Sequence, residues 1–181
     1  KIMINDEHED IIGSLGEPRI KWARSEGFNL WKKHGGGTVP FDPVQIIQSL
    51  GIHLKEEELT MDGVSRVDAN GLMFIMYKKN CAPVRKRFTL AHELGHIILE
   101  HVNIGSSSQH STNSQEIEAN HFANALLVPA DDLKKFMKQS FRQLHDVQQR
   151  YDVSKDVAFL AVKENKLFTR LRSTAAALHI M

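Results

Sequence analysis

The sequence predicts an α+β fold that is mainly helical with a small antiparallel sheet. Apolar residues recur with helical spacing over most of the chain, and one central segment changes to strand spacing around an Asn-Gly pair. With 41% apolar and 25% charged residues, the 181-residue chain is long enough to bury one core. We therefore expect a single domain over 17–168, between an N-terminal extension, 1–16, and a tail, 169–181.

Two helices are expected before the sheet. The first, from Glu17 to His34, has a proline near its start and is stopped by three consecutive glycines. The second runs from Asp42 to Leu50, where Asp42 can cap the helix N-terminus ahead of a proline at the first helical position. Helices and sheet together should fill the first part of the domain, 17–100.

The sheet is expected to contain a hairpin. Strands Val64–Ala69 and Leu72–Tyr77 flank Asn70-Gly71, a pair that tolerates the positive φ angles of a two-residue turn. The segment Ile52–Glu57 is the candidate third strand. The sequence therefore places a small sheet in the middle of the chain.

Helical spacing returns after the sheet and persists. One helix should run from Pro83 to about Glu100, and another from about Ser114 to Val128. The polar stretch Asn103–Asn113 between them is predicted to be an exposed, mobile loop. Two or three shorter helices should complete the second part of the domain, 114–168.

Charge and composition exclude several classes of protein. The 23 Lys and Arg residues nearly balance the 22 Asp and Glu residues, so there is no global charge for binding nucleic acid or membrane surfaces. Apolar runs are too short to span a bilayer, and the acidic start lacks a secretory signal pattern. The lone Cys81 cannot form an internal disulfide, which suits a reducing compartment. We expect a cytoplasmic protein.

The segment "RFTLAHELGH" carries two histidines four residues apart, with a glutamate after the first. On a helix, His92 and His96 project from one face, so both imidazoles can bind the same metal ion. Glu93 lies about 100° around the helix from His92, close enough to act on a water without binding the ion. The alternative is that both histidines are core residues paired with carbonyl groups.

A catalytic metal site needs a third protein ligand. The longer motif H-E-x-x-H-x-x-G-x-x-H is excluded, because Leu99 and Val102 occupy its last two defined positions. The segment "EIEAN" offers Glu116 as the ligand, with Asn120 one turn later on the same face to accept a hydrogen bond from a ligand histidine. Glu118 remains the alternative ligand.

The blocks "RFTLAHELGH" and "EIEANHFANALLVP" resemble those of the ImmA/IrrE metallopeptidases of bacteria and mobile elements. The resemblance implies a zincin-like core and a zinc-dependent endopeptidase that cleaves a helix-turn-helix transcriptional repressor. By this resemblance His92, His96 and Glu116 match the metal ligands, and Glu93 matches the catalytic glutamate. One departure is that a histidine often follows four residues after the second ligand. Here Glu100 occupies that place and His101 follows, a difference that we interpret as peripheral to the chemistry.

The expected chemistry is metal-assisted hydrolysis with Glu93 as general base. Two histidines and a carboxylate suit Zn²⁺ and also Mn²⁺. An extended substrate is expected to pair with an edge of the hairpin sheet, so that proline within Val64–Ala69 weakens cleavage without loss of metal. The sequence does not rank the candidates for oxyanion stabilisation, which are Tyr77, His110, His121, Tyr151, Arg85 and Arg87.

Two other functions are compatible with the sequence. The helices expected over 141–167 resemble a helix-turn-helix, and 142–172 contains seven Lys or Arg against four Asp or Glu, which suggests DNA or repressor binding. The second of these helices is largely apolar, however, so we expect it to pack on the core and direct DNA binding to be absent. A protein that binds its repressor without cleaving it is the other alternative, and the intact Glu93 argues against it. No membrane partner is expected.

Overall fold

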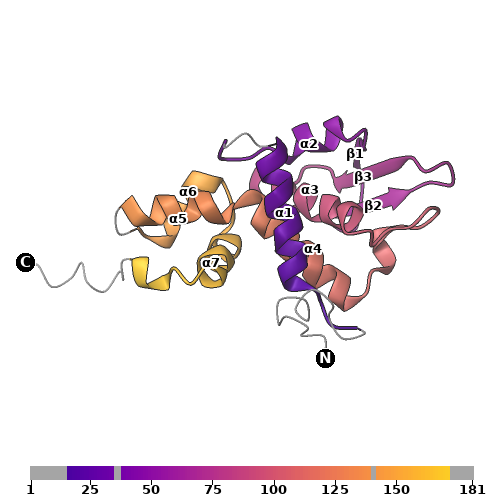
Figure 1. Ribbon diagram of the computed structural model, residues 1–181. Helices are drawn as coiled ribbons and strands as arrows, with labels where there is room; N and C mark the ends of the chain where they lie inside the picture. The colour runs from indigo at the N-terminus through magenta and orange to yellow at the C-terminus, as the bar shows by residue number, and fades with distance from the viewer. Residues whose placement is uncertain (1–15, 35–37, 140–141, 172–181) are drawn as a thin grey trace, which may run out of the picture.

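The computed structural model describes residues 16–34, 38–139 and 142–171 (Figure 1). The glycine stop and most of the predicted N-terminal extension and tail lie outside these residues. The described part confirms the α+β class, with a mainly helical chain around one small sheet. Its elements are α1 (Ile20–His34), α2 (Pro43–Ser49), β1 (His53–Glu57), β2 (Gly63–Val67), β3 (Met73–Lys78), α3 (Pro83–Ile98), α4 (Asn113–Leu127), α5 (Ala130–Gln139), α6 (Leu144–Tyr151) and α7 (Lys155–Glu164).

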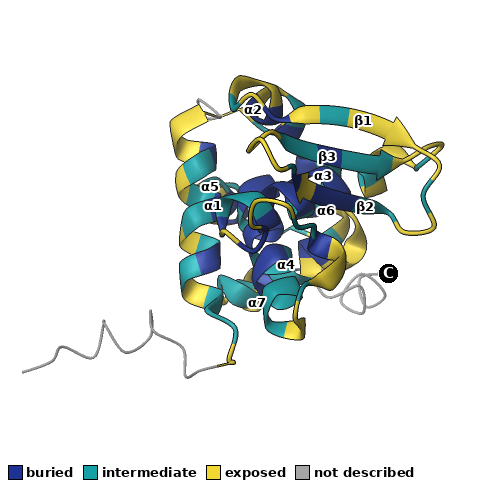
Figure 2. Cartoon of the chain, turned by 90° about the vertical axis from the view of Figure 1, so that its right-hand side faces the viewer, coloured by how far each residue is buried: buried dark blue, intermediate teal, exposed yellow. Residues whose placement is uncertain are grey.

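The core is built on the packing of α1, α3 and α4, with their buried faces turned inward (Figure 2). Gly27 of α1 lies against the backbone of Phe122 in α4, where a Cβ atom would collide with the carbonyl oxygen. Gly95 of α3 lies against the Phe122 ring, and a Cβ there would be 3.0 Å from it. Small residues at these two crossings therefore hold α1 and α3 close to α4.

The sheet has the strand order β1-β3-β2. The predicted hairpin is confirmed, because β2 and β3 are antiparallel with Val64 opposite Met76. The predicted two-residue turn is wrong: the Asp68 N–H donates to the carbonyl of Leu72, so three residues form the turn, and of Asn70 and Gly71 only Gly71 has a positive φ. The predicted third strand is also present, but β1 runs parallel to β3, so the sheet is mixed and not purely antiparallel. The chain reverses between β1 and β2 without pairing these two strands, and β3 then enters the space between them.

The stretch 103–113 is mostly exposed, as predicted, but it is also bound to the edge of the sheet. Ile104 and Ser107 form bridges with Val67 and Arg66 of the outer strand β2. Ser108, at the start of a short 3-10 turn, is buried, and its hydroxyl accepts a hydrogen bond from the backbone N–H of Ser65. Local polarity predicted exposure, but the loop supplies partners to the backbone groups of a sheet edge, which would otherwise be unpaired.

The C-terminal helices contribute buried residues to the same core as the preceding helices. Four residues of α7 are buried: Val157, Ala158, Ala161 and Val162. The amide of Asn124 in α4 donates to the carbonyl oxygen of Val157 over 2.8 Å. The predicted cap at Ser154 is confirmed, and packing of the apolar helix on the core is confirmed with it. None of the helices in the described residues has the length and apolar character needed to cross a membrane.

Candidate metal centre

Helix α3 has a buried apolar side and a second side that faces α4. Leu90, Ala91 and Leu94 are buried in the core. His92 and His96 are four residues apart, so their rings project from neighbouring turns toward α4. The apolar residues thus fix the rotation of the helix about its axis, and with it the position of both imidazoles.

Helix α4 begins three residues before Glu116, the residue that faces these rings. The Thr112 hydroxyl accepts from the backbone N–H of Gln115 over 3.3 Å, and the Gln115 side chain accepts from the N–H of Thr112 over 2.8 Å. This capping box fixes the first turn of the helix, which contains Glu116. The capping box therefore fixes the backbone of the turn that carries the Glu116 carboxylate.

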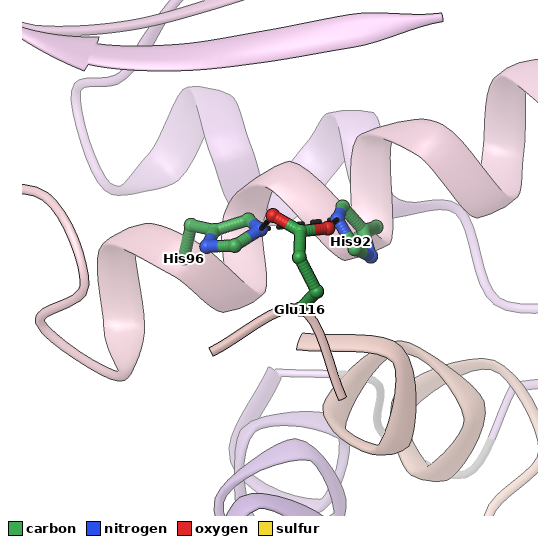
Figure 3. A group of neighbouring side chains, drawn as sticks. All are labelled: His92, His96 and Glu116. Carbon is green, nitrogen blue, oxygen red and sulfur yellow. Dashed lines mark hydrogen bonds and ion pairs between the residues drawn. The ribbon is translucent and has the colours of Figure 1, made fainter. Parts of the chain in front are cut away.

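Three side chains from the two helices converge (Figure 3). The Nε2 atoms of His92 and His96 are 3.0 Å apart. The Glu116 carboxylate lies between the rings, with Oε2 3.3 Å from His92 Nε2 and Oε1 3.3 Å from His96 Nε2. One ligand atom from each residue lies within 4.8 Å of the others. Two imidazoles and one carboxylate are the donor set of many catalytic zinc sites, so these residues fit a divalent cation.

The protonation of these groups also suits a cation. Burial and the charge of His92 lower the pKa of His96 to about 3, so its ring stays neutral at physiological pH. Burial lowers the pKa of His92, but the hydrogen bond and charge of Glu116 and the charge of Glu93 outweigh it and raise the pKa. The hydrogen bond with His92 in turn lowers the pKa of Glu116. A cation between them would therefore displace a proton that these groups share.

Asn120 lies one turn after Glu116 and is also in contact with α3. Its carboxamide oxygen is 3.0 Å from Nδ1 of His92. Because the oxygen only accepts, Nδ1 carries the hydrogen, and Nε2 then has a free electron pair on the side of Glu116.

Glu93 is buried beside the three converging residues, with 5% of its surface exposed. Its Oε2 accepts from the hydroxyl of Ser108 over 2.9 Å, and Ser108 in turn accepts from Ser65 of β2. Burial raises the pKa of Glu93 above its ordinary value of 4.5, and the hydrogen bond from Ser108 and the charge of His92 only partly oppose this. A carboxylate with a raised pKa suits proton transfer near neutral pH.

Glu118, the alternative ligand, turns away from the histidine pair. Its carboxylate accepts hydrogen bonds from the backbone and guanidinium of Arg19, at 2.7 to 3.1 Å. It also contacts Nε2 of His101 over 2.9 Å, while Nδ1 of His101 is 3.1 Å from Nδ1 of His96. The sequence interpretation missed this contact, because it treated His101 as peripheral and did not consider Arg19. A histidine soon after the metal-binding motif was the available signal.

A cleft of about 380 Å³ opens over these groups. Besides His92, Glu93, Glu116 and Asn120, it is lined by Met61, Asp62, Gly63, Phe88, Thr89, Ser108 and Gln109. The cleft therefore places the converging side chains at a surface that a peptide can reach. The Gln109 side chain at its wall was not anticipated from the sequence.

The side chains considered for oxyanion stabilisation do not line this cleft. Each of five contacts another partner, as follows: Tyr77 with Lys86, Arg85 with Asp62, Arg87 with Asp152, His121 with Glu164, and Tyr151 with Asp132. The sixth, His110, is exposed on the 103–113 loop. The amides of Gln109 and Asn120 are nearer to the cleft than any of the six.

Comparisons with known proteins agree with this arrangement. Residues 47–162 match the family model of the IrrE N-terminal-like domain, Peptidase_M78. Among solved structures, a Mycobacterium tuberculosis transcriptional regulator is similar, with a TM-score of 0.54 and 15% sequence identity over 75% of this chain and 45% of that one. At this identity the likeness shows the fold alone, and the chain spans less than half of the regulator's length. None of the curated proteins matches the chain.

Proposed function

Because the chain belongs to the family of the IrrE N-terminal-like domain, Peptidase_M78, we propose that it is a metal-dependent endopeptidase that cleaves a helix-turn-helix transcriptional repressor. The observation that carries this proposal is the convergence of His92, His96 and Glu116 beside the buried Glu93, at a cleft that His92, Glu93 and Glu116 line. A family of peptidases and a donor set that fits a divalent cation together favour metal-assisted hydrolysis over simple binding.

In the proposed mechanism His92, His96 and Glu116 hold the ion, for which Zn²⁺ is our first candidate and Mn²⁺ the second. When bound, such an ion lowers the pKa of water and polarises a peptide carbonyl. Asn120 orients His92 through its Nδ1 hydrogen. The three ligands come from two helices that share one core, so the geometry is held without the substrate.

Glu93 is the proposed general base. One of its carboxylate oxygens, Oε2, is occupied by the hydroxyl of Ser108, which leaves Oε1 to take a proton from the attacking water. The same oxygen then delivers this proton to the amine of the leaving peptide. The raised pKa of Glu93 favours both transfers, because the carboxyl binds and releases the proton closer to neutral pH.

The substrate is proposed to be an extended strand that pairs with β2 at Gly63 alone, because the 103–113 loop covers the edge from Ser65 to Val67. Lys78 donates to the carbonyl of Asp62, so the antiparallel pairing turns the backbone groups of Gly63, Ser65 and Val67 away from β3. The 103–113 loop already bonds to both backbone groups of Val67 and to the N–H of Ser65. Gly63 lies at the cleft, so we place the pairing there.

The proposed substrate is a repressor, which places the reaction in the cytoplasm. The similar solved structure is named a transcriptional regulator, and this agrees with a role in gene regulation. The 23 Lys and Arg residues nearly balance the 22 Asp and Glu residues, so the repressor is the proposed partner rather than its operator.

The test is a comparison of the wild-type protein with Glu93→Gln after mixing with the repressor encoded beside its gene. Glu93→Gln should retain metal, measured by elemental analysis, and should retain repressor binding, but cleavage on a gel should fall at least about 10³-fold. Glu57→Gln, on the exposed strand β1, is the control and should cleave normally. A wild-type protein that binds the repressor and leaves it intact would instead support a binding function without cleavage.

A further inference from the structure

A chain of polar groups runs from His96 to the surface, on the side of the ring opposite Glu116. His96 Nδ1 is 3.1 Å from Nδ1 of His101, and His101 Nε2 is 2.9 Å from Oε2 of Glu118. The side chains of His101 and Glu118 are only 2% and 4% exposed, so water does not replace these contacts. Arg19, just before α1, ends the chain with two guanidinium hydrogen bonds and one backbone hydrogen bond to Glu118.

The positions of the hydrogens in this chain follow from the Glu118 end. An ionised carboxylate only accepts, so His101 must carry its hydrogen on Nε2. A neutral His101 then has a free electron pair on Nδ1, and the 3.1 Å contact requires a hydrogen on Nδ1 of His96. The neutral ring of His96 consequently has its free pair on Nε2, the atom that faces Glu116 and His92.

The positions of these hydrogens depend on the positive charge of Arg19. Its guanidinium pairs with Glu118 through Nε and Nη2, a geometry that holds the carboxylate ionised and fixes its plane. Arg19 also stacks over the ring of Trp22 at 3.9 Å, which limits the orientations of the guanidinium. The backbone N–H of Arg19 adds a third contact that ties the start of α1 to α4.

We propose that Arg19, Glu118 and His101 are positioning residues that fix the tautomer and orientation of His96 for metal binding. The inference rests on the proposed function, since it takes His96 as a metal ligand. His92 is held differently, by the neutral amide of Asn120. The hydroxyl of Ser111, 3.3 Å from His96 Nδ1, can donate or accept, so it does not select a tautomer by itself.

The test compares the affinity of the metal-free full-length chain for Zn²⁺ among variants that are folded by circular dichroism. Glu118→Gln and His101→Phe should weaken Zn²⁺ binding by about 10- to 100-fold, as expected when a partner of a metal-binding histidine is removed. Arg19→Met removes the guanidinium but can still contact Trp22 through its thioether, and it should cause a smaller loss in the same direction. Ser111→Ala should have less effect than His101→Phe.

A second measurement separates orientation from general stability. In the metal-free ¹⁵N-labelled protein, long-range ¹H–¹⁵N correlation of the imidazoles should show His96 with hydrogen on Nδ1 and a bare Nε2. Glu118→Gln should give a mixture of tautomers, whereas a purely structural role would leave the His96 signals as they are. His53→Gln, on the exposed strand β1, is the control and should change neither the His96 signals nor the affinity. If His101→Phe does not fold, Glu118→Gln and Arg19→Met decide the question.

The proposal is overturned if folded Glu118→Gln binds Zn²⁺ within about twofold of the wild type, or if wild-type His96 carries its hydrogen on Nε2. Failure of the proposed function has a different signature. A wild-type chain that binds Zn²⁺ tightly but never cleaves a repressor refutes the peptidase assignment and leaves the role of His101 intact. A wild-type chain with no affinity for divalent cations refutes both.

Discussion

The hydroxyl of Ser108 donates to Oε2 of Glu93 over 2.9 Å, which connects the 103–113 loop to the proposed general base. The same hydroxyl accepts from the backbone N–H of Ser65 over 3.0 Å. One small side chain thus joins the outer strand of the sheet to helix α3 at the wall of the cleft.

Ser108→Ala should move the acid side of the pH profile for cleavage to higher pH. The hydrogen bond from Ser108 favours the ionised form of Glu93, so its removal raises the pKa of a carboxyl that burial has already raised. A general base must be ionised, and activity therefore falls as the pH drops through this pKa. The measurement is kcat/KM against pH, from about 5 to 8.

Ser107→Ala, the adjacent position in the same loop, is the control and should leave the profile unchanged. Ser108→Ala also leaves the N–H of Ser65 without its partner, so we expect a loss of about 1–3 kcal/mol in the free energy of unfolding. An acid side of the profile that moves to lower pH, or does not move, would contradict the role given to this hydroxyl.

Gly63→Ala should impair both stability and cleavage. A Cβ at this position would lie 2.5 Å from Cγ2 of Thr89 and 3.1 Å from Cγ of Glu93, so β2 and α3 would have to separate. We expect a loss of about 1–3 kcal/mol in unfolding free energy and a fall in kcat, both measurable on the purified protein. Gly71→Ala is the matched control, because its Cβ meets open space and only the positive φ of 81° is strained. Equal effects of the two variants on kcat would refute the explanation that a Cβ at position 63 separates β2 from α3.

Local spacing predicted most of the fold, because helix periodicity and caps are encoded within a few residues. Asp42 and Ser154 each cap the helix that follows them, and both caps were predicted. The parallel pairing of β1 with β3 was not predicted, because it depends on how the hairpin lies against a strand that precedes it in the chain.

In the candidate site, too, the local relationships were predicted and the long-range contacts were not. The sequence places His92 and His96 one turn apart, and the same spacing argument brings Glu116 and Asn120 to one face of α4. The hydrogen bonds between Arg19 and Glu118 join residues 99 positions apart. No local pattern indicates such a contact, since it arises only when α1 packs on α4.

Metal removal should lower the thermal stability of the protein. An ion that binds only the folded state at about 100 times its dissociation constant adds about 2.7 kcal/mol, or roughly 5–10 °C in melting temperature for a domain of this size. Added Zn²⁺ should therefore restore the melting temperature of the chelated wild type. Glu116→Gln should lose most of this increment, while His53→Gln should keep it. If added Zn²⁺ raises the melting temperature of Glu116→Gln as much as that of the wild type, Glu116 is not a ligand.

Glu118 should make the stability of the fold depend on acid pH. Burial raises the pKa of Glu118, but the hydrogen bonds from Arg19 and His101 outweigh it, so the pKa lies below its ordinary value of 4.5. A carboxyl whose pKa is lower in the folded than in the unfolded state stabilises the protein at a pH above its unfolded pKa. This contribution is lost as the pH falls through the folded pKa. Glu118→Gln should therefore lower the unfolding free energy by about 2 kcal/mol at pH 7. The difference from the wild type should shrink below about pH 4.5, as measured by urea denaturation in the chelated protein. Glu57→Gln on the exposed strand β1 should show neither effect. If the difference in unfolding free energy between the wild type and Glu118→Gln grows on acidification, the Glu118 carboxyl is not stabilised in its ionised form.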